Sequence, residues 1–132
     1  MGKRNTARRL AVQALYQADL SNEPIERALE NVVEGEDYIP ETSSFATQLA
    51  KSAWDKRDET DNIITKMAID WPLDRIGKVD RAILRLSLSE IAIGETPVSV
   101  IINEAVELAK KYSSPEAAKF INGILGAYVR KM

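Results

Sequence analysis

The chain has 132 residues, of which 45% are hydrophobic and 29% are charged, and its formal net charge is −2. This size and composition are typical of a single globular domain. The sequence contains no cysteine and no histidine, which excludes disulfides, thiolate chemistry and the commonest metal ligand, so we expect no cofactor. No apolar run approaches the roughly 20 residues that cross a bilayer, and no signal peptide is evident, so we expect a cytoplasmic protein.

Charge is distributed unevenly along the chain. The first eighteen residues carry four basic side chains and no acidic one. These four residues, which we call the basic arm, are Lys3, Arg4, Arg8 and Arg9. Residues 19–61 reverse the balance, with twelve acids against four bases. A cluster of one sign is an argument about partners rather than about fold, and the basic arm predicts binding to a polyanion.

Hydrophobic periodicity predicts helices in the N-terminal half, over about 6–20, 24–33 and 43–56. Residues 34–42 are expected to form a loop, and the charged run 55–61 is expected to contain the turn into a fourth helix that ends before Pro72. In the first helix, Tyr16 lies on the same face as Arg9. Tyr16 is therefore either a half-buried residue or part of a stacking surface beside the basic arm.

The segment 71–93 is the one around which we expect the chain to be organised. Its apolar side chains cover most of a helical projection, which indicates a central helix covered by several neighbours. Its narrow polar band consists of Lys78, Arg81, Arg85 and Ser89. Asp80 and Glu90 project within the apolar arc, and each is either a paired acid at the core edge or part of a partner-binding groove. Gly94 is expected to end the helix.

Two further helices follow. Apolar residues recur at helical spacing over 98–112, with Tyr112 as the last of them, and this pattern predicts an amphipathic helix. Ser114 followed by Pro115 is a strong signal for the start of the last helix. Phe120 projects away from the apolar stripe of this last helix, so it either packs on a neighbouring element or is exposed for binding. No segment alternates as a β-strand does. The fold class is therefore predicted as all-α, a bundle of about seven helices.

Three stretches of the chain resemble the NusB family of bacterial transcription antitermination factors. They are RRLAVQALYQ near the N-terminus, WPLDRIGKVDRAILRLSLSEI in the centre and TPVSVIINEAVELAKKYSSPEAAKFINGIL toward the C-terminus. The resemblance covers nearly the whole chain. It implies a compact helical fold with an N-terminal subdomain of about 1–57 and a C-terminal subdomain of about 58–132, and no enzymatic activity.

The resemblance also implies partners. The first is NusE, a small-subunit ribosomal protein that doubles as an elongation factor. NusE and a NusB-family protein would together bind the single-stranded boxA element of ribosomal RNA leaders. Other elongation factors and RNA polymerase would be reached indirectly, and premature termination would be suppressed.

The family's functional residues can be matched to positions of this chain. The arginine-rich motif corresponds to the basic arm, and the tyrosine of the first helix to Tyr16. The last helix supplies Glu116 and Phe120. The partner surface corresponds to Asp80, with Asp74 in the preceding turn. The chain departs from the family pattern at Asn5 and Thr6, where arginines often continue, and in the short side chain of Asp80.

Elementary chemistry supports the same residues. Single-stranded RNA needs positive charge for its phosphates and flat groups for its unstacked bases. The basic arm, Lys119, Tyr16 and Phe120 supply both if the first and last helices lie side by side, with Arg8 and Phe120 on one surface. Four arm charges predict a slope of about −3 for the logarithm of affinity against the logarithm of salt concentration, hence weak RNA binding without a partner.

Two alternatives remain beside the RNA adaptor. One is a protein-interaction module that contacts its partner through Asp80 and Arg81 and leaves the basic arm solvated. The other is an accessory domain of the kind that precedes the catalytic part of certain ribosomal RNA cytosine methyltransferases. An enzyme is disfavoured, because carboxylates, lysines and tyrosines are the titratable groups that remain and there is no glycine-rich phosphate loop, although a carboxylate pair could still be assembled in space.

Overall fold

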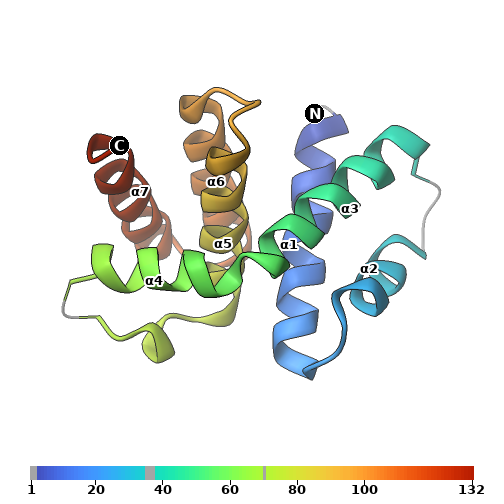
Figure 1. The fold of residues 1–132 in the computed structure, drawn as a ribbon, viewed down its shortest axis with the longest axis horizontal. Coiled ribbons are helices and arrows are strands. Elements are labelled where there is room, and N and C mark those ends of the chain that lie inside the picture. Colours follow the sequence, from blue (N-terminus) through green and yellow to red (C-terminus); the bar gives the residue numbers. More distant parts are fainter. Residues whose placement is uncertain (1–2, 35–37, 70) are drawn as a thin grey trace.

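The computed structural model describes residues 3–34, 38–69 and 71–132. Within these residues the chain forms seven α-helices, one short 3₁₀ helix and no strand, which confirms the all-α class (Figure 1). The helices are α1 (Lys3–Ser21), α2 (Ile25–Glu34), α3 (Pro40–Asp55), α4 (Arg57–Met67), η1 (Leu73–Arg75), α5 (Lys78–Ile93), α6 (Val98–Tyr112) and α7 (Pro115–Arg130).

Two helix starts differ from the sequence prediction, whereas the turn into the fourth helix lies within 55–61 as predicted. Helix α1 begins at Lys3, so the basic arm is its first two turns and not an extended tail. Helix α3 begins at Pro40, since a proline at the first helical position loses no hydrogen bond. The turn within 55–61 consists of Lys56, and α4 begins at Arg57. Acids in the first turn of α4 favour this early start through the helix dipole.

Helix α5 is the central helix, as the sequence predicts. Every residue from Ala82 to Ile91 is buried. Helices α1, α3, α4, α6 and α7 all pack on α5. The helix begins after Gly77 and ends at Gly94, whose φ of 77° is the left-handed conformation that glycine adopts without a steric penalty.

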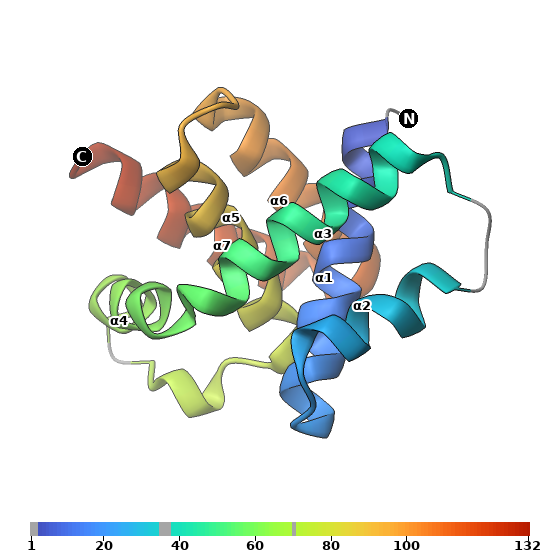
Figure 2. The same ribbon diagram turned by 45° about the vertical axis from the view of Figure 1, so that its right-hand side comes forward.

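The remaining helices form two groups around α5. Helices α1, α2 and α3 pack on one another, and α3 crosses α1 (Figure 2). Helices α6 and α7 pack on each other, and α4 contacts α7. The division into subdomains of about 1–57 and 58–132 stays a prediction, because α5 joins both groups. Among the described residues, no helix is long and apolar enough to span a membrane.

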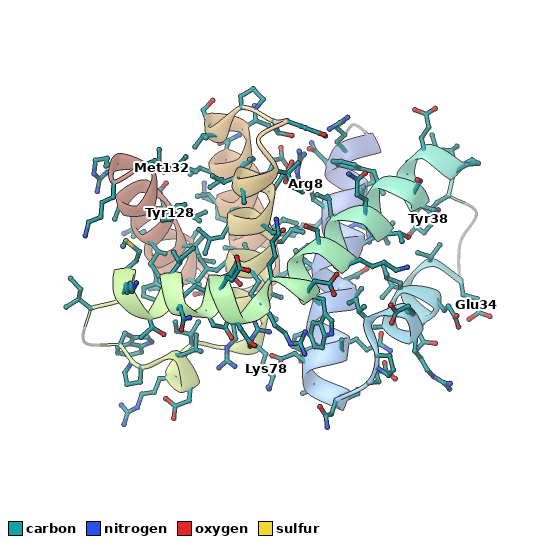
Figure 3. All side chains as sticks on the ribbon, in the orientation of Figure 1. Arg8, Glu34, Tyr38, Lys78, Tyr128 and Met132 are labelled. Atoms are coloured by element: carbon teal, nitrogen blue, oxygen red, sulfur yellow. The ribbon has the colours of Figure 1, made fainter. Side chains whose placement is uncertain are left out.

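A buried ion pair ties α1 to α5. Arg8 and Glu90 are each 3% exposed. The Arg8 Nε donates to Glu90 Oε1 at 2.8 Å, and Arg8 Nη2 donates to Glu90 Oε2 at 2.6 Å. Figure 3 shows Arg8 where α1 faces α5. The hydrogen bond to Glu90 raises the pKa of Arg8 above its ordinary value, which outweighs the lowering by burial. Glu90 is thus a paired core acid, the first of its two predicted readings.

Most of the polar band of α5 is also paired within the described part of the chain, with the exception of the buried Arg81 Nε. Arg85 donates to both Asp61 oxygens at 2.8 and 2.7 Å, and Asp19 lies 3.7 Å away. Burial lowers the pKa of Arg85, but the hydrogen bond and charge of Asp61, together with the charges of Asp19 and Asp58, leave the pKa raised above its ordinary value. The hydroxyls of Ser89 and Ser52 lie 3.1 Å apart, and Lys78 is 3.5 Å from Asp19. The band therefore connects α5 to α1, α3 and α4.

Replacing Arg8 tests the energetic role of the buried pair. We expect Arg8→Met to lower the free energy of unfolding by about 3–5 kcal/mol, because Glu90 is left buried without its partner. The double variant Arg8→Met/Glu90→Met should recover most of this loss. Urea unfolding followed by circular dichroism measures both, with Arg9→Met as the control, expected within about 0.5 kcal/mol of the parent. A loss below about 1 kcal/mol for Arg8→Met would contradict a stabilising role of the Arg8–Glu90 pair.

Candidate nucleic-acid interface

The residues of the basic arm point in different directions. Arg8 is buried against Glu90, so the expectation that its guanidinium is exposed is wrong. The Arg4 guanidinium lies over the Phe45 ring of α3, 4.4 Å from its centroid. Arg9 turns the other way, toward α6. The side chain of Lys3 lies outside the described residues. The structure thus leaves Arg9 as the arm residue that faces a groove shared with α6.

That groove, which we call the α1–α6 groove, has a volume of about 410 Å³. It is lined by Asn5, Thr6, Arg9, Glu104, Glu107, Leu108, Lys110, Lys111 and Tyr112. Tyr112 is 41% exposed, and the Lys111 Nζ lies 5.4 Å from its ring centroid. The groove therefore combines an accessible aromatic ring with three cations, the two elements that hold single-stranded nucleic acid.

The two acids of the α1–α6 groove are both engaged. The Asn5 amide, oriented with its nitrogen toward α6, donates to both oxygens of Glu104 at 3.1 Å. Glu107 Oε2 lies 3.4 Å from Lys110 Nζ, and both side chains are more than half exposed. Such an exposed pair contributes little energy and opens at low cost. Lys110 is therefore available to a ligand.

A second groove runs between α6 and α7 and shares Lys110 with the first. The α6–α7 groove has a volume of about 540 Å³. It is lined by Ser99, Ile102, Asn103, Val106, Lys110, Pro115, Ala118, Lys119 and Asn122. Lys119, predicted as an RNA contact, lies here. The two grooves together form a cationic surface that extends over α1, α6 and α7.

The hypothesis of a patch built directly by both chain ends is wrong. Helix α1 packs on α2, α3 and α5, whereas α7 packs on α4, α5 and α6. Figure 1 shows α5 and α6 between α1 and α7. Arg8 and Phe120 therefore share no surface, and the link between Arg9 and Lys119 is made by α6 instead.

Phe120 and Glu116 lie on the other side of α7, in what we call the α5–α7 pocket. This pocket, of about 500 Å³, is lined by Ile69, Trp71, Arg75, Ile76, Gly77, Asp80, Ser114, Glu116, Ala117 and Phe120. Phe120 is half-buried and packs against the main core. Ile69 is 80% exposed and Trp71 is 48% exposed. The pocket thus joins two predicted RNA residues to the predicted partner residue Asp80.

The predicted partner residues are in three different situations. Asp80 Oδ1 is buried and has no hydrogen-bond partner within the described part of the chain. Arg81 Nη2 donates to the carbonyls of Leu73 and Ile76 at 2.8 and 3.3 Å, so Arg81 holds the η1 turn against α5. Asp74 lies in η1 and is exposed. Arg81 Nε is likewise buried without a hydrogen-bond partner among the described residues, so Asp80 and Arg81 each keep one unsatisfied atom beneath the surface.

The sequence prediction of the site missed most of α6. The sequence pattern does not identify Lys110, Lys111 and Tyr112 as site residues. Tyr112 fits the end of the apolar stripe of the helix, which indicates a core residue. The signal that could have found them is the cluster of two lysines and an aromatic residue at a helix end. Tyr16 is half-buried, packs against the main core and does not line either groove. This is the position expected from the first reading of Tyr16, a half-buried residue.

The described residues form no candidate metal centre. Within residues 3–34, 38–69 and 71–132, no three acidic side chains are grouped to hold an ion.

Comparison with known proteins gives a consistent result. The model of the NusB family matches residues 5–130. The transcription antitermination protein NusB of Bacillus subtilis is 44% identical over 93% of this chain and 92% of its own length. A crystal structure of antitermination factors NusB and NusE in complex with dsRNA matches with a TM-score of 0.91 at 32% identity, covering 100% of this chain and 99% of that chain. The solution structure of NusB from Aquifex aeolicus matches with a TM-score of 0.85 at 32% identity, covering 98% and 89%.

The half-buried position of Phe120 predicts a moderate contribution to stability. We expect Phe120→Ala to lower the free energy of unfolding by about 2 kcal/mol, below the 3–5 kcal/mol of a fully buried phenylalanine. Thermal and urea unfolding measure the change, with the exposed neighbour Lys119→Ala as the control, expected within about 0.5 kcal/mol. A loss as small as that of the control would show that the ring does not pack on the core.

Proposed function

The chain belongs to the NusB family of transcription antitermination proteins, which are not enzymes, and from this membership we propose that it binds single-stranded boxA-type RNA of ribosomal RNA leaders together with NusE. In this role it is an RNA-binding adaptor that reaches other elongation factors and RNA polymerase indirectly. The same role places it in the cytoplasm, where the nascent RNA is made.

One observation carries the RNA proposal, the cationic surface over α1, α6 and α7. Among the residues that the structure describes, four basic side chains and two acidic ones line its two grooves. The rest of the chain is acidic and repels RNA, so the charge favours one binding surface. The four basic residues are Arg9, Lys110, Lys111 and Lys119.

The chemistry of the surface favours a single strand. Tyr112 is an exposed ring on which an unstacked base can lie, and grooves between helices accommodate bases that are turned away from their own strand. A duplex offers no free base faces to Tyr112. We therefore expect tighter binding of a single-stranded boxA-type oligonucleotide than of the same sequence in a duplex.

The partner is proposed to occupy the α5–α7 pocket. Two large apolar side chains, Ile69 and Trp71, are exposed beside it. Asp80 also lines this pocket, and its negative charge would attract a cationic group of NusE. A pocket of this kind also supports the alternative function, a helical protein-interaction module without direct RNA contact.

Removing two charges tests RNA binding by the cationic surface. We expect Arg9→Ala/Lys119→Ala to weaken binding of a fluorescein-labelled single-stranded boxA-type RNA and to make the salt slope less steep by about 1.4, since each phosphate contact contributes about 0.7. Fluorescence anisotropy at several salt concentrations measures the slope. The control Lys51→Ala/Lys66→Ala removes two exposed charges outside both grooves and should leave the slope unchanged. Equal slopes for the two double variants would favour the alternative function.

Reversing a charge tests the partner pocket. We expect Asp80→Lys to weaken NusE binding at least about tenfold, equivalent to about 1.4 kcal/mol, because a donor from NusE would meet a cation instead of a carboxylate. Isothermal titration calorimetry measures the affinity, and a melting curve confirms that the variant folds. Glu59→Lys, which reverses an exposed charge on α4, is the control. Unchanged affinity for NusE would remove Asp80 from the partner surface.

A further inference from the structure

The α6–α7 groove differs in chemistry from the α1–α6 groove beside it. Its lining includes the apolar side chains of Ile102, Val106 and Ala118. No acidic residue lines it, whereas Glu104 and Glu107 line the α1–α6 groove. A flat, largely apolar ligand that carries negative charge fits this combination best.

The groove also offers two free amides. Asn103 of α6 and Asn122 of α7 are exposed, and neither side chain has a hydrogen-bond partner among the described residues. A primary amide presents two donors and one acceptor in a plane, and asparagine can form two hydrogen bonds with one base edge. The amides therefore provide a means of distinguishing one base from another.

Two ammonium groups complete the set. Lys110 of α6 and Lys119 of α7 both line the groove. A phosphate on either side of a base could contact these ammonium groups while the base lies on the apolar side chains. Lys110 also lines the α1–α6 groove, so a strand bound there at Arg9 can continue across α6 without leaving the cationic surface.

We propose that the α6–α7 groove binds one unstacked nucleotide of the RNA strand and that the amides of Asn103 and Asn122 read its base. The proposal rests on the function proposed above and names a specificity site within it. The lysines hold the phosphates and set the affinity for any sequence, and the asparagines set the preference at one position.

Asparagine substitutions separate base reading from charge. The variant is Asn103→Ala/Asn122→Ala, measured with a panel of labelled single-stranded RNAs that differ at one position each. For the preferred RNA we expect about a tenfold loss of affinity, the effect of one good amide–base contact. The loss should disappear for the RNA substituted at the position that the groove reads. The salt slope should stay that of the parent, because no charge is removed.

A matched control is available in the same chain. Asn31→Ala/Asn62→Ala removes two exposed amides from α2 and α4, outside both grooves, and should bind every RNA of the panel as the parent does. An unchanged base preference in Asn103→Ala/Asn122→Ala would overturn the proposal. If Arg9→Ala/Lys119→Ala still weakens binding in that case, the RNA-binding function stands and only the reading site falls. If neither double variant changes binding, both fall.

Discussion

The bidentate ion pair between Arg8 and Glu90 determines how the first helix presents its charges. It holds one face of α1 against α5, and the directions of Arg4 and Arg9 follow from it. Arg4 lies one turn before Arg8 on the same side, and both guanidiniums approach the Phe45 ring, at 4.4 and 5.9 Å from its centroid. Arg9 is rotated by about 100° from Arg8, which turns it toward α6. A change in the Arg8 contact would therefore alter the surface that carries Arg9.

The same pair changes the electrostatics of the N-terminus. The pKa of Arg8 is raised by its hydrogen bond to Glu90, so the arginine stays charged, but the adjacent carboxylate cancels its field at the surface. A cluster of four cations in the sequence thus does not act as four cations toward an external polyanion. The lysines of α6 and α7 add positive charge to the surface that carries Arg9. A chain with a net charge of −2 can therefore offer a cationic surface.

The fold was more predictable from the sequence than the site was. The central position of α5, its end at Gly94 and the cap of α7 at Ser114, whose hydroxyl accepts from the Ala117 amide at 3.0 Å, all follow from local patterns. Local patterns contain no information on which charge meets which across the molecule. The partner of Arg8 is 82 positions away in the sequence, so a buried arginine and a solvated one are indistinguishable there. The same limit applies to Tyr112, whose helical spacing fits an apolar stripe although the residue is 41% exposed.

Helix α7 separates the two proposed binding regions. Lys119 and Phe120 are neighbours in the sequence, yet Lys119 lines the α6–α7 groove and Phe120 lines the α5–α7 pocket. The helix between them is regular and packed on α4, α5 and α6. If RNA and NusE bind as proposed, the two ligands approach each other beyond the edge of α7, and contact between them there would increase both affinities. Thermodynamic linkage requires such an increase to be equal for both ligands. The adaptor then acts by holding RNA and protein next to each other on two sides of α7.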